Sequence, residues 1–109
     1  MGDAAFGMAG LDIETAARAR IGIMTVVLNN GVMTHYDSNM PFSSKSHGTN
    51  ALGGDYAKVA EGLGAHTEVV DNPTQLGPAI LRAANANKTG QPALIEVKTK
   101  AEEEVPRFY

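Results

Sequence analysis

Cysteine is absent from the 109-residue sequence, which excludes disulfide bonds, thiolate nucleophiles and cysteine-based zinc sites. The nine Lys and Arg residues form no cluster and the net charge is −3, so we expect no nucleic-acid partner. No segment approaches the roughly 20 apolar residues of a membrane-spanning helix. The first residues lack both a charged start and an uninterrupted apolar core, so we expect no signal peptide and a cytoplasmic protein.

The length fits one small domain and is too short for two ordinary ones. Hydrophobic residues make up 43% of the sequence and charged residues 19%, which indicates a globular fold. Apolar segments alternate with amphipathic ones, and they predict helices over 7–20, 55–63 and 72 to about 86, and strands over 23–28, 67–70 and 93–98. This alternation predicts an α/β fold with a parallel sheet and helices on both faces.

Two segments are predicted to lie outside this regular pattern. Residues from about 31 to 52 are rich in Ser, Asn, Gly and His, and they are too many for an ordinary connection. We therefore predict a mobile, functional loop there. The residues from about 100 to 109, which include three consecutive glutamates, are predicted to form a solvated C-terminal tail.

Asp3 and Asn30 lie 27 residues apart, and each is next to a predicted end of a strand. Their carboxylate and amide oxygens are hard ligands, suited to Mg²⁺ or Ca²⁺. In a βαβ unit both groups would emerge at the carboxyl edge of the sheet, beside the positive end of the intervening helix, where phosphate groups bind. The spacing therefore suggests a metal-bridged diphosphate site. Turn formation is the plainer alternative for both Gly-Asp-Ala and Asn-Asn-Gly.

A longer motif contains both residues. The run Gly-Asp-Ala-Ala-Phe-Gly-Met-Ala-Gly-Leu-Asp-Ile-Glu-Thr-Ala, continuing through Arg18 to Val-Leu-Asn-Asn at 27–30, resembles the diphosphate-binding motif of thiamine-diphosphate enzymes. It is most similar to the group of acetolactate synthase, oxalyl-CoA decarboxylase and 2-hydroxyacyl-CoA lyase. The resemblance extends from Gly2 to about Thr99 and implies the C-terminal part of a thiamine-diphosphate-binding domain, here residues 1–109.

The resemblance also implies a set of site residues. The metal ligands that it implies are the side chains of Asp3 and Asn30 and the backbone carbonyl of Val32. The residues implied to bind the cofactor, through Mg²⁺ or by lying against the diphosphate, are Gly2, Asp3, Ala4, Ala5, Asn30 and Val32. Ala4 stands where the family often has Gly, and its methyl group is small enough to be tolerated.

Three other positions bear on chemistry. Thr34 stands where the acyl-CoA branch often has Tyr, which weighs against CoA-thioester chemistry. The family takes its activating glutamate from a different domain, and no residue here matches it, so no catalytic residue is assigned. His35 lies five positions after Asn30 and could face the cofactor, although a solvent-facing loop histidine is the plainer interpretation.

The resemblance implies binding of thiamine diphosphate with Mg²⁺, within an enzyme that makes or breaks carbon–carbon bonds next to the carbonyl of a 2-oxo acid or acyl substrate. We expect this chain to be inactive alone and to form a homo-oligomer or to need the missing domains, because an absent first strand would expose a hydrophobic sheet edge. Two alternatives remain from the residues: a phosphate-ligand-binding module without chemistry, and a subunit-association module.

Overall fold

The computed structural model describes residues 1–101, so residues 102–109, and with them most of the predicted tail, lie outside the described part. Its elements in chain order are α1 (Asp3–Ala9), α2 (Asp12–Arg18), β1 (Met24–Asn29), α3 (Tyr36–Asn39), α4 (Pro41–His47), α5 (Tyr56–Gly62), β2 (His66–Val70), α6 (Pro73–Lys88) and β3 (Ala93–Lys98). Within residues 1–101, no helix has the length and apolar character needed to cross a membrane.

The three strands form one parallel sheet in the order β1-β3-β2. Ala93, at the start of the central strand β3, pairs with Met24 of β1 on one side and with His66 of β2 on the other. The connection from β1 to β2 therefore skips one position, and α6 leads the chain back to the centre of the sheet. The parallel α/β fold predicted from the sequence is confirmed.

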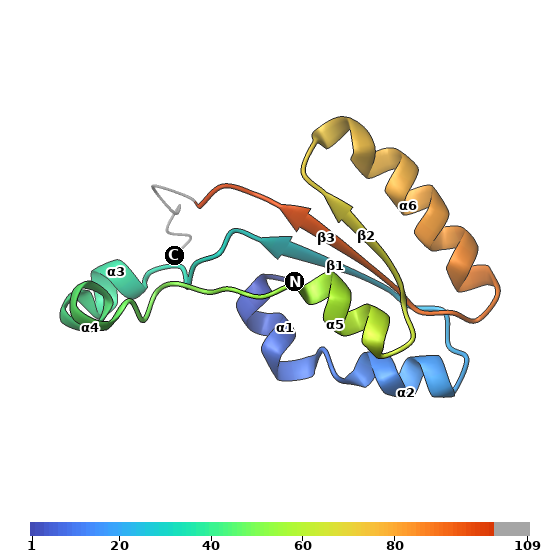
Figure 1. The fold of residues 1–109 in the computed structure, drawn as a ribbon, viewed down its shortest axis with the longest axis horizontal. Coiled ribbons are helices and arrows are strands. Elements are labelled where there is room, and N and C mark those ends of the chain that lie inside the picture. Colours follow the sequence, from blue (N-terminus) through green and yellow to red (C-terminus); the bar gives the residue numbers. More distant parts are fainter. Residues whose placement is uncertain (102–109) are drawn as a thin grey trace, which may run out of the picture.

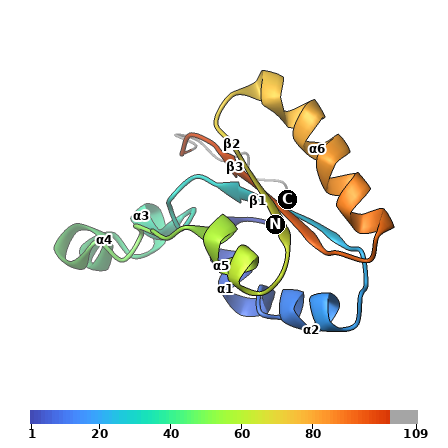
Figure 2. The same cartoon turned by 45° about the vertical axis from the view of Figure 1, so that its right-hand side comes forward.

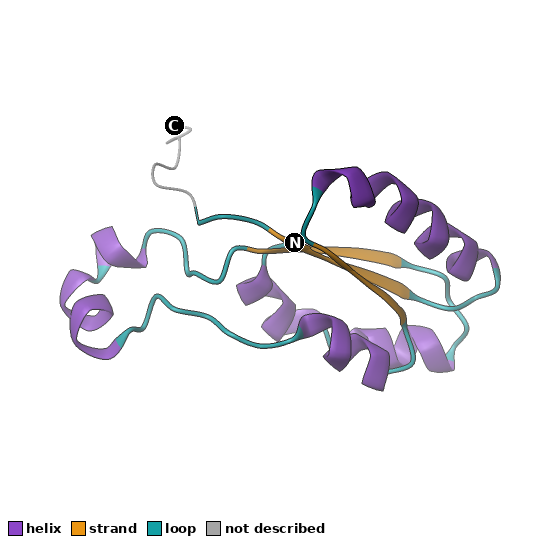
Figure 3. Cartoon of the chain, turned by 45° about the horizontal axis from the view of Figure 1, so that its top comes forward, coloured by secondary structure: helices purple, strands orange, loops and turns teal. Residues whose placement is uncertain are grey.

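Helices cover both faces of this sheet, with α1, α2 and α5 on one face and α6 on the other (Figures 1, 2 and 3). Leu94 and Ile95 are adjacent in β3 and both are fully buried, because successive side chains point to opposite faces. Leu94 packs in a cluster with Phe6 and Val27, whereas Ile95 packs with small residues of α6. One core therefore lies on each side of the central strand.

Local signals explain several element boundaries. The Asn72 side chain accepts a hydrogen bond from the Thr74 N–H at 3.0 Å, and Pro73 occupies the first turn, so α6 begins where the sequence predicts. The helix α5 is followed by Gly64 at φ 96°, a backbone conformation that favours glycine. Gly64 therefore turns the chain into β2.

The prediction of one helix over residues 7–20 is wrong. The chain forms two short helices, because Gly10 and Leu11 interrupt the helical pattern, and α1 already begins at Asp3. A Cβ at position 10 would lie 2.6 Å from the ring of Phe6, which is buried against the sheet. The lack of a side chain at Gly10 thus lets the Phe6 ring pack against it, while the backbones of Gly10 and Leu11 keep helical dihedral angles.

The predicted loop at 31–52 contains the short helices α3 and α4, which project away from the sheet (Figure 1). Its base is closed by two backbone hydrogen bonds, from the Met33 N–H to the Asn50 carbonyl at 2.7 Å and from the Leu52 N–H to the Gly31 carbonyl at 2.9 Å. The segment is therefore a hairpin of two helices on a closed stem. Its mobility stays a prediction.

The outer edge of β1 is paired along part of its length. The Met1 amino group donates to the Val26 carbonyl at 2.7 Å, and the Leu28 N–H donates to the Met1 carbonyl at 2.8 Å. Gly2 forms a parallel bridge with Leu28. Residues 1–2 therefore lie where a further parallel strand would pair, and they lead directly into α1.

Candidate functional site

The carboxyl edge of the sheet contains a cleft of about 360 Å³ between the end of β1 and the start of α1. It is lined by Gly2, Asp3, Ala4, Ala5, Leu28, Asn30, Val32, Met33 and Thr34. The topology thus brings all six predicted site residues to one place, although their role in binding stays a prediction. In open α/β sheets this edge is where ligands bind.

Asp3 differs from the sequence-based expectation in its local structure. It is the first residue of α1, directly after the Gly2 bridge, and does not lie in a loop. In this position one carboxylate oxygen, Oδ1, accepts a hydrogen bond from the Ala4 N–H at 2.9 Å. The other, Oδ2, accepts one from the Gly31 N–H at 2.9 Å. Asp3 therefore joins the start of α1 to the turn that follows β1.

The Asp3 carboxylate is buried and lacks a cationic partner among the described residues. The residue is 4% exposed, and within residues 1–101 no Lys, Arg or His side chain forms an ion pair with it. A buried carboxylate without a cationic partner is costly. Because each carboxylate oxygen can accept further contacts, a divalent cation in the cleft fits this group.

Asn30 also lines the cleft, at the start of the turn. Its Oδ1 accepts a hydrogen bond from the Val32 N–H at 3.1 Å, and Gly31 between them adopts φ 72°. The predicted Asn-Asn-Gly turn is therefore present. It does not exclude the ligand role, because an amide oxygen has a second lone pair. The oxygen chemistry at the cleft suits a hard cation such as Mg²⁺.

The first turn of α1 supplies backbone donors to the same cleft. The opening N–H groups of a helix have no backbone acceptor inside the helix, and Ala4 and Ala5 carry two of these groups. The Ala4 N–H already donates to Asp3 Oδ1, whereas the Ala5 N–H has no acceptor in the described part of the chain. Their side chains are single methyl groups, which leaves the backbone accessible from the cleft. An anionic group such as a diphosphate fits beside a metal ion at this place.

Sequence reasoning missed Glu96, which lies in the central strand and is fully buried. It accepts hydrogen bonds from Asn29 Nδ2 at 2.7 Å, from the Ala57 N–H at 2.9 Å and from the ammonium group of Lys98. Burial acts to raise the pKa of Glu96, but these hydrogen bonds, above all that from Lys98, outweigh it and lower the pKa. A glutamate inside an otherwise apolar, doubly buried strand was the available signal.

None of the three histidines lines the cleft. His35 is exposed, in agreement with the plainer interpretation, and its backbone adopts φ 69° at the start of α3. His66 lies on β2, where its Nε2 is 2.9 Å from Glu68 Oε1. Among residues 1–101, no three His, Asp or Glu side chains are grouped as in a side-chain metal centre. A metal at the cleft would thus depend on Asp3, one amide and backbone oxygens.

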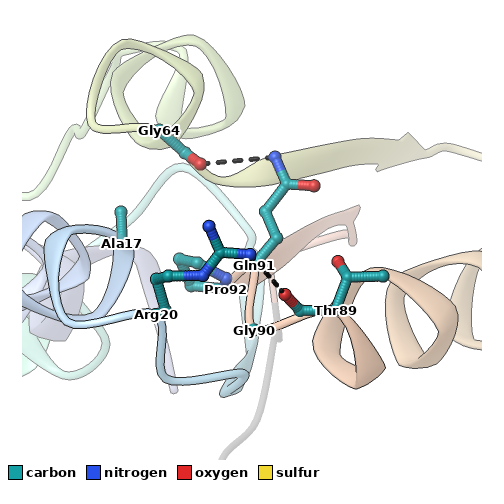
Figure 4. A pocket seen from close by; sticks show the side chains of 7 residues that line it. All are labelled: Ala17, Arg20, Gly64, Thr89, Gly90, Gln91 and Pro92. Atoms are coloured by element: carbon teal, nitrogen blue, oxygen red, sulfur yellow. Dashed lines mark hydrogen bonds between the residues drawn. The ribbon is translucent and has the colours of Figure 1, made fainter.

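A second cavity, of about 210 Å³, lies at the amino ends of the strands (Figure 4). Arg20 and Gln91 line it, and both are engaged with backbone carbonyls. Arg20 Nη2 donates to the Thr89 carbonyl at 3.3 Å, and Gln91 Nε2 donates to the Gly64 carbonyl at 3.4 Å. None of the predicted site residues lines this cavity. The carboxyl-edge cleft is therefore the candidate site.

Several known proteins are similar to this chain in sequence, and solved structures are similar to it in fold. Residues 1–97 match the family model described as "Thiamine pyrophosphate enzyme, C-terminal TPP binding domain". The acetolactate synthase large subunit of Mycobacterium tuberculosis is 31% identical over 97% of this chain and 19% of that protein. The 2-hydroxyacyl-CoA lyase of Saccharomyces cerevisiae is 29% identical over 81% of this chain and 16% of that protein.

Among solved structures, the thiamine diphosphate-dependent 4-hydroxybenzoylformate decarboxylase of Rhodococcus jostii RHA1 matches with a TM-score of 0.75 and 28% identity, over 95% of this chain and 20% of that one. This chain thus spans at most about a fifth of the length of these relatives. The match over residues 1–97 and the parallel fold agree with the motif found in the sequence. The chain therefore belongs to the thiamine pyrophosphate enzyme family, as its C-terminal TPP-binding domain.

Proposed function

We propose that this chain binds thiamine diphosphate (thiamine pyrophosphate) through Mg²⁺ at the carboxyl-edge cleft. The observation that supports this most is the Asp3 carboxylate, which is 4% exposed, has no ion-pair partner in the described part of the chain, and is hydrogen-bonded to the residue after Asn30. A bound divalent cation would compensate the buried charge. The same cation would neutralise a diphosphate beside the first turn of α1.

The six predicted site residues divide into two roles in this proposal. Asp3 and Asn30 hold Mg²⁺ through side-chain oxygens, and Val32 does so through its backbone carbonyl. The backbone of residues 2, 4 and 5 lies against the diphosphate. This division matches the chemistry of the groups, since Mg²⁺ prefers oxygen ligands and phosphate oxygens accept hydrogen bonds from N–H groups.

We further propose that the chain serves an enzyme that makes or breaks carbon–carbon bonds next to a carbonyl, with 2-oxo acids as substrates. When bound, thiamine diphosphate supplies a thiazolium carbanion that adds to a carbonyl carbon and holds the resulting electron density. The names of the relatives, an acetolactate synthase and a 4-hydroxybenzoylformate decarboxylase, support this reaction class. Thr34 lines the cleft and offers a small hydroxyl where the acyl-CoA branch often has Tyr.

The chain alone is proposed to bind without turning over substrate. It contains the anchor for the diphosphate, but no residue that matches the activating glutamate expected from another domain. This chain covers about a fifth of the length of these relatives, and we expect the residues that select a substrate to lie largely in the parts that it does not cover. Decarboxylation of a 2-oxo acid, or carboligation, by the purified chain would contradict this part of the proposal.

Isothermal titration calorimetry with thiamine diphosphate tests the binding proposal. We expect binding in Mg²⁺ that is lost in EDTA, and lost in Asp3→Ala and in Asn30→Ala. Asp12→Ala and Asn85→Ala remove the same groups from exposed positions on α2 and α6, and we expect both to bind as the unmodified chain does. Equal binding without Mg²⁺ would favour a simple phosphate-binding module, and absence of binding by a folded chain would contradict the proposal.

A further inference from the structure

Glu96 connects three elements, of which β1 contributes Leu28 to the cleft, although Glu96 does not line the cleft itself. Its Oε1 accepts from Asn29 Nδ2 at 2.7 Å, at the end of β1. Its Oε2 accepts from the Ala57 N–H at 2.9 Å, in the first turn of α5. Glu96 itself is in β3, so one carboxylate joins a central strand, an edge strand and a helix.

The first connection leads to Asn30. Asn29 is the last residue of β1, and its carbonyl accepts a hydrogen bond from the Thr99 N–H at 2.9 Å. Beyond it the chain leaves the sheet through Asn30 and Gly31. The Asn29 side chain, fixed by Glu96, restrains the direction in which that turn begins.

The second connection leads to Asp3. The first turn of α5 contains Tyr56, whose ring packs edge-on against the ring of Phe6 with centroids 5.4 Å apart. Phe6 is one turn along α1 from Asp3 and is 5% exposed. By fixing the start of α5, Glu96 therefore supports the packing on which the position of α1 depends.

A buried carboxylate is a costly way to fill this space, because an apolar side chain of similar volume often stabilises a fold as well or better. The cost is reduced by Lys98, whose side chain is 43% exposed and whose ammonium group contacts Glu96. Fully satisfied buried networks of this kind fix one arrangement of the surrounding elements. In metal sites, groups that hold the ligands commonly matter nearly as much as the ligands.

We propose that Glu96 is a positioning residue for the cleft: through Asn29 and the start of α5 it holds Asn30 and Asp3 in register with each other. This inference rests on the proposed Mg²⁺ and thiamine diphosphate binding for its functional consequence. Its structural part concerns the ligand-free chain and is tested separately.

Amide hydrogen exchange of the ligand-free chain tests the structural part. In Glu96→Gln one acceptor oxygen is replaced by a donor, and in Asn29→Ala the contact to Glu96 is deleted. We expect the Gly31 amide to exchange at least about tenfold faster in both variants, relative to amides at the centre of β3 in the same protein. Glu68→Gln alters another strand carboxylate, on the α6 face, and should not change this ratio.

Calorimetry tests the functional part. We expect the Mg²⁺ concentration that supports half-maximal binding of thiamine diphosphate to rise about ten- to a hundredfold in Glu96→Gln and Asn29→Ala, as for other residues that orient metal ligands. Glu68→Gln should bind as the unmodified chain does. If Glu96→Gln fails to fold, Asn29→Ala decides the result, because its substitution removes a partly exposed side chain.

The outcomes separate the two proposals. If the unmodified chain binds in Mg²⁺ and Asp3→Ala does not, while Glu96→Gln and Asn29→Ala bind normally, the positioning role is contradicted and the binding proposal stands. If the unmodified chain does not bind, the binding proposal fails. The Gly31 exchange ratio then decides the positioning role by itself: an unchanged ratio contradicts it.

Discussion

The carboxylate of Asp3 accepts a hydrogen bond from the backbone N–H of Gly31 at 2.9 Å, across 28 positions of sequence. This bond ties the first turn of α1 to the turn after β1, where Gly31 adopts φ 72°. It is geometrically possible because both segments leave the sheet at its carboxyl edge. The buried carboxylate and the Asn30 amide therefore border one cleft.

Gly31→Ala is expected to weaken thiamine diphosphate binding at the cleft, beyond its effect on the stability of the fold. A side chain at positive φ costs about 1–2 kcal/mol, although a Cβ here would have ordinary contacts. Gly48→Ala is the matched control, since Gly48 has φ 60° and open space around its Cβ position, away from the cleft. Urea unfolding should show similar losses for both variants, whereas calorimetry should show weaker thiamine diphosphate binding for Gly31→Ala alone. Equal binding by both variants would contradict the importance of this turn.

Leu94→Ala is expected to lower the free energy of unfolding by about 2–5 kcal/mol, because it opens a cavity beneath the fully buried centre of the sheet. Leu81→Ala makes the same change on α6, where the side chain is 68% exposed, and should alter stability by less than about 0.5 kcal/mol. Chemical denaturation followed by circular dichroism measures both. Equal losses would show that β3 is not the centre of the core.

The three strands could be predicted from the sequence because buried strands leave a recognisable apolar pattern in it. A strand buried on both faces needs a nearly continuous apolar run, and β3 matches its predicted bounds of 93–98. The helix predicted over 7–20 was wrong because its apolar pattern continued through Leu11. That side chain is 72% exposed in the structure. At the break the Phe6 ring packs against Gly10, a contact that periodicity does not contain.

The candidate site was predictable only in part, for a similar reason. Asp3 and Asn30 could be paired because parallel strands place their following residues at one edge, and because the motif resembles a known one. The contacts of Glu96 could not be predicted because its partners are distant in sequence: Asn29 is 67 positions away and Ala57 is 39. Local patterns report burial and periodicity, whereas a buried hydrogen-bond network depends on the assembled fold.

Stability should fall on acidification partly through Glu68. Two hydrogen bonds from Arg82, at 2.7 and 2.9 Å, hold the pKa of this carboxyl below its usual value. As the pH falls, the Glu68 carboxylate is protonated first in the unfolded chain, where its pKa is about 4.3. The contribution of Glu68 is therefore complete above that pH and is lost as pH falls through the lower folded-state pKa.

The difference in unfolding free energy between the unmodified chain and Glu68→Gln, at most about 1 kcal/mol at neutral pH, should shrink as pH is lowered from 6 to about 3. Urea midpoints at a series of pH values measure it. A difference for Glu68→Gln that grows on acidification would contradict the assignment.

Self-association through β1 is expected for the chain in solution. Among residues 1–101 only Met1 and Gly2 pair with the outer edge of this strand, and Leu28 on it is 50% exposed. Leu28→Lys should lower the mean mass in light scattering, because charged side chains blunt an open edge. Leu81→Lys adds the same charge on α6 and should leave the mass unchanged. A sharp monomer mass with cooperative melting of the unmodified chain would contradict the expectation.

Joint binding of one divalent ion by Asp3 and Asn30 can be tested directly by paramagnetic nuclear magnetic resonance. Substoichiometric Mn²⁺ is added to the ¹⁵N-labelled chain with thiamine diphosphate. We expect selective broadening of the Asn30 side-chain amide and of the backbone amides of Ala4 and Gly31, all of it lost in Asp3→Ala. Broadening spread over residues near the exposed carboxylates, or unchanged in Asp3→Ala, would contradict joint binding by these two residues.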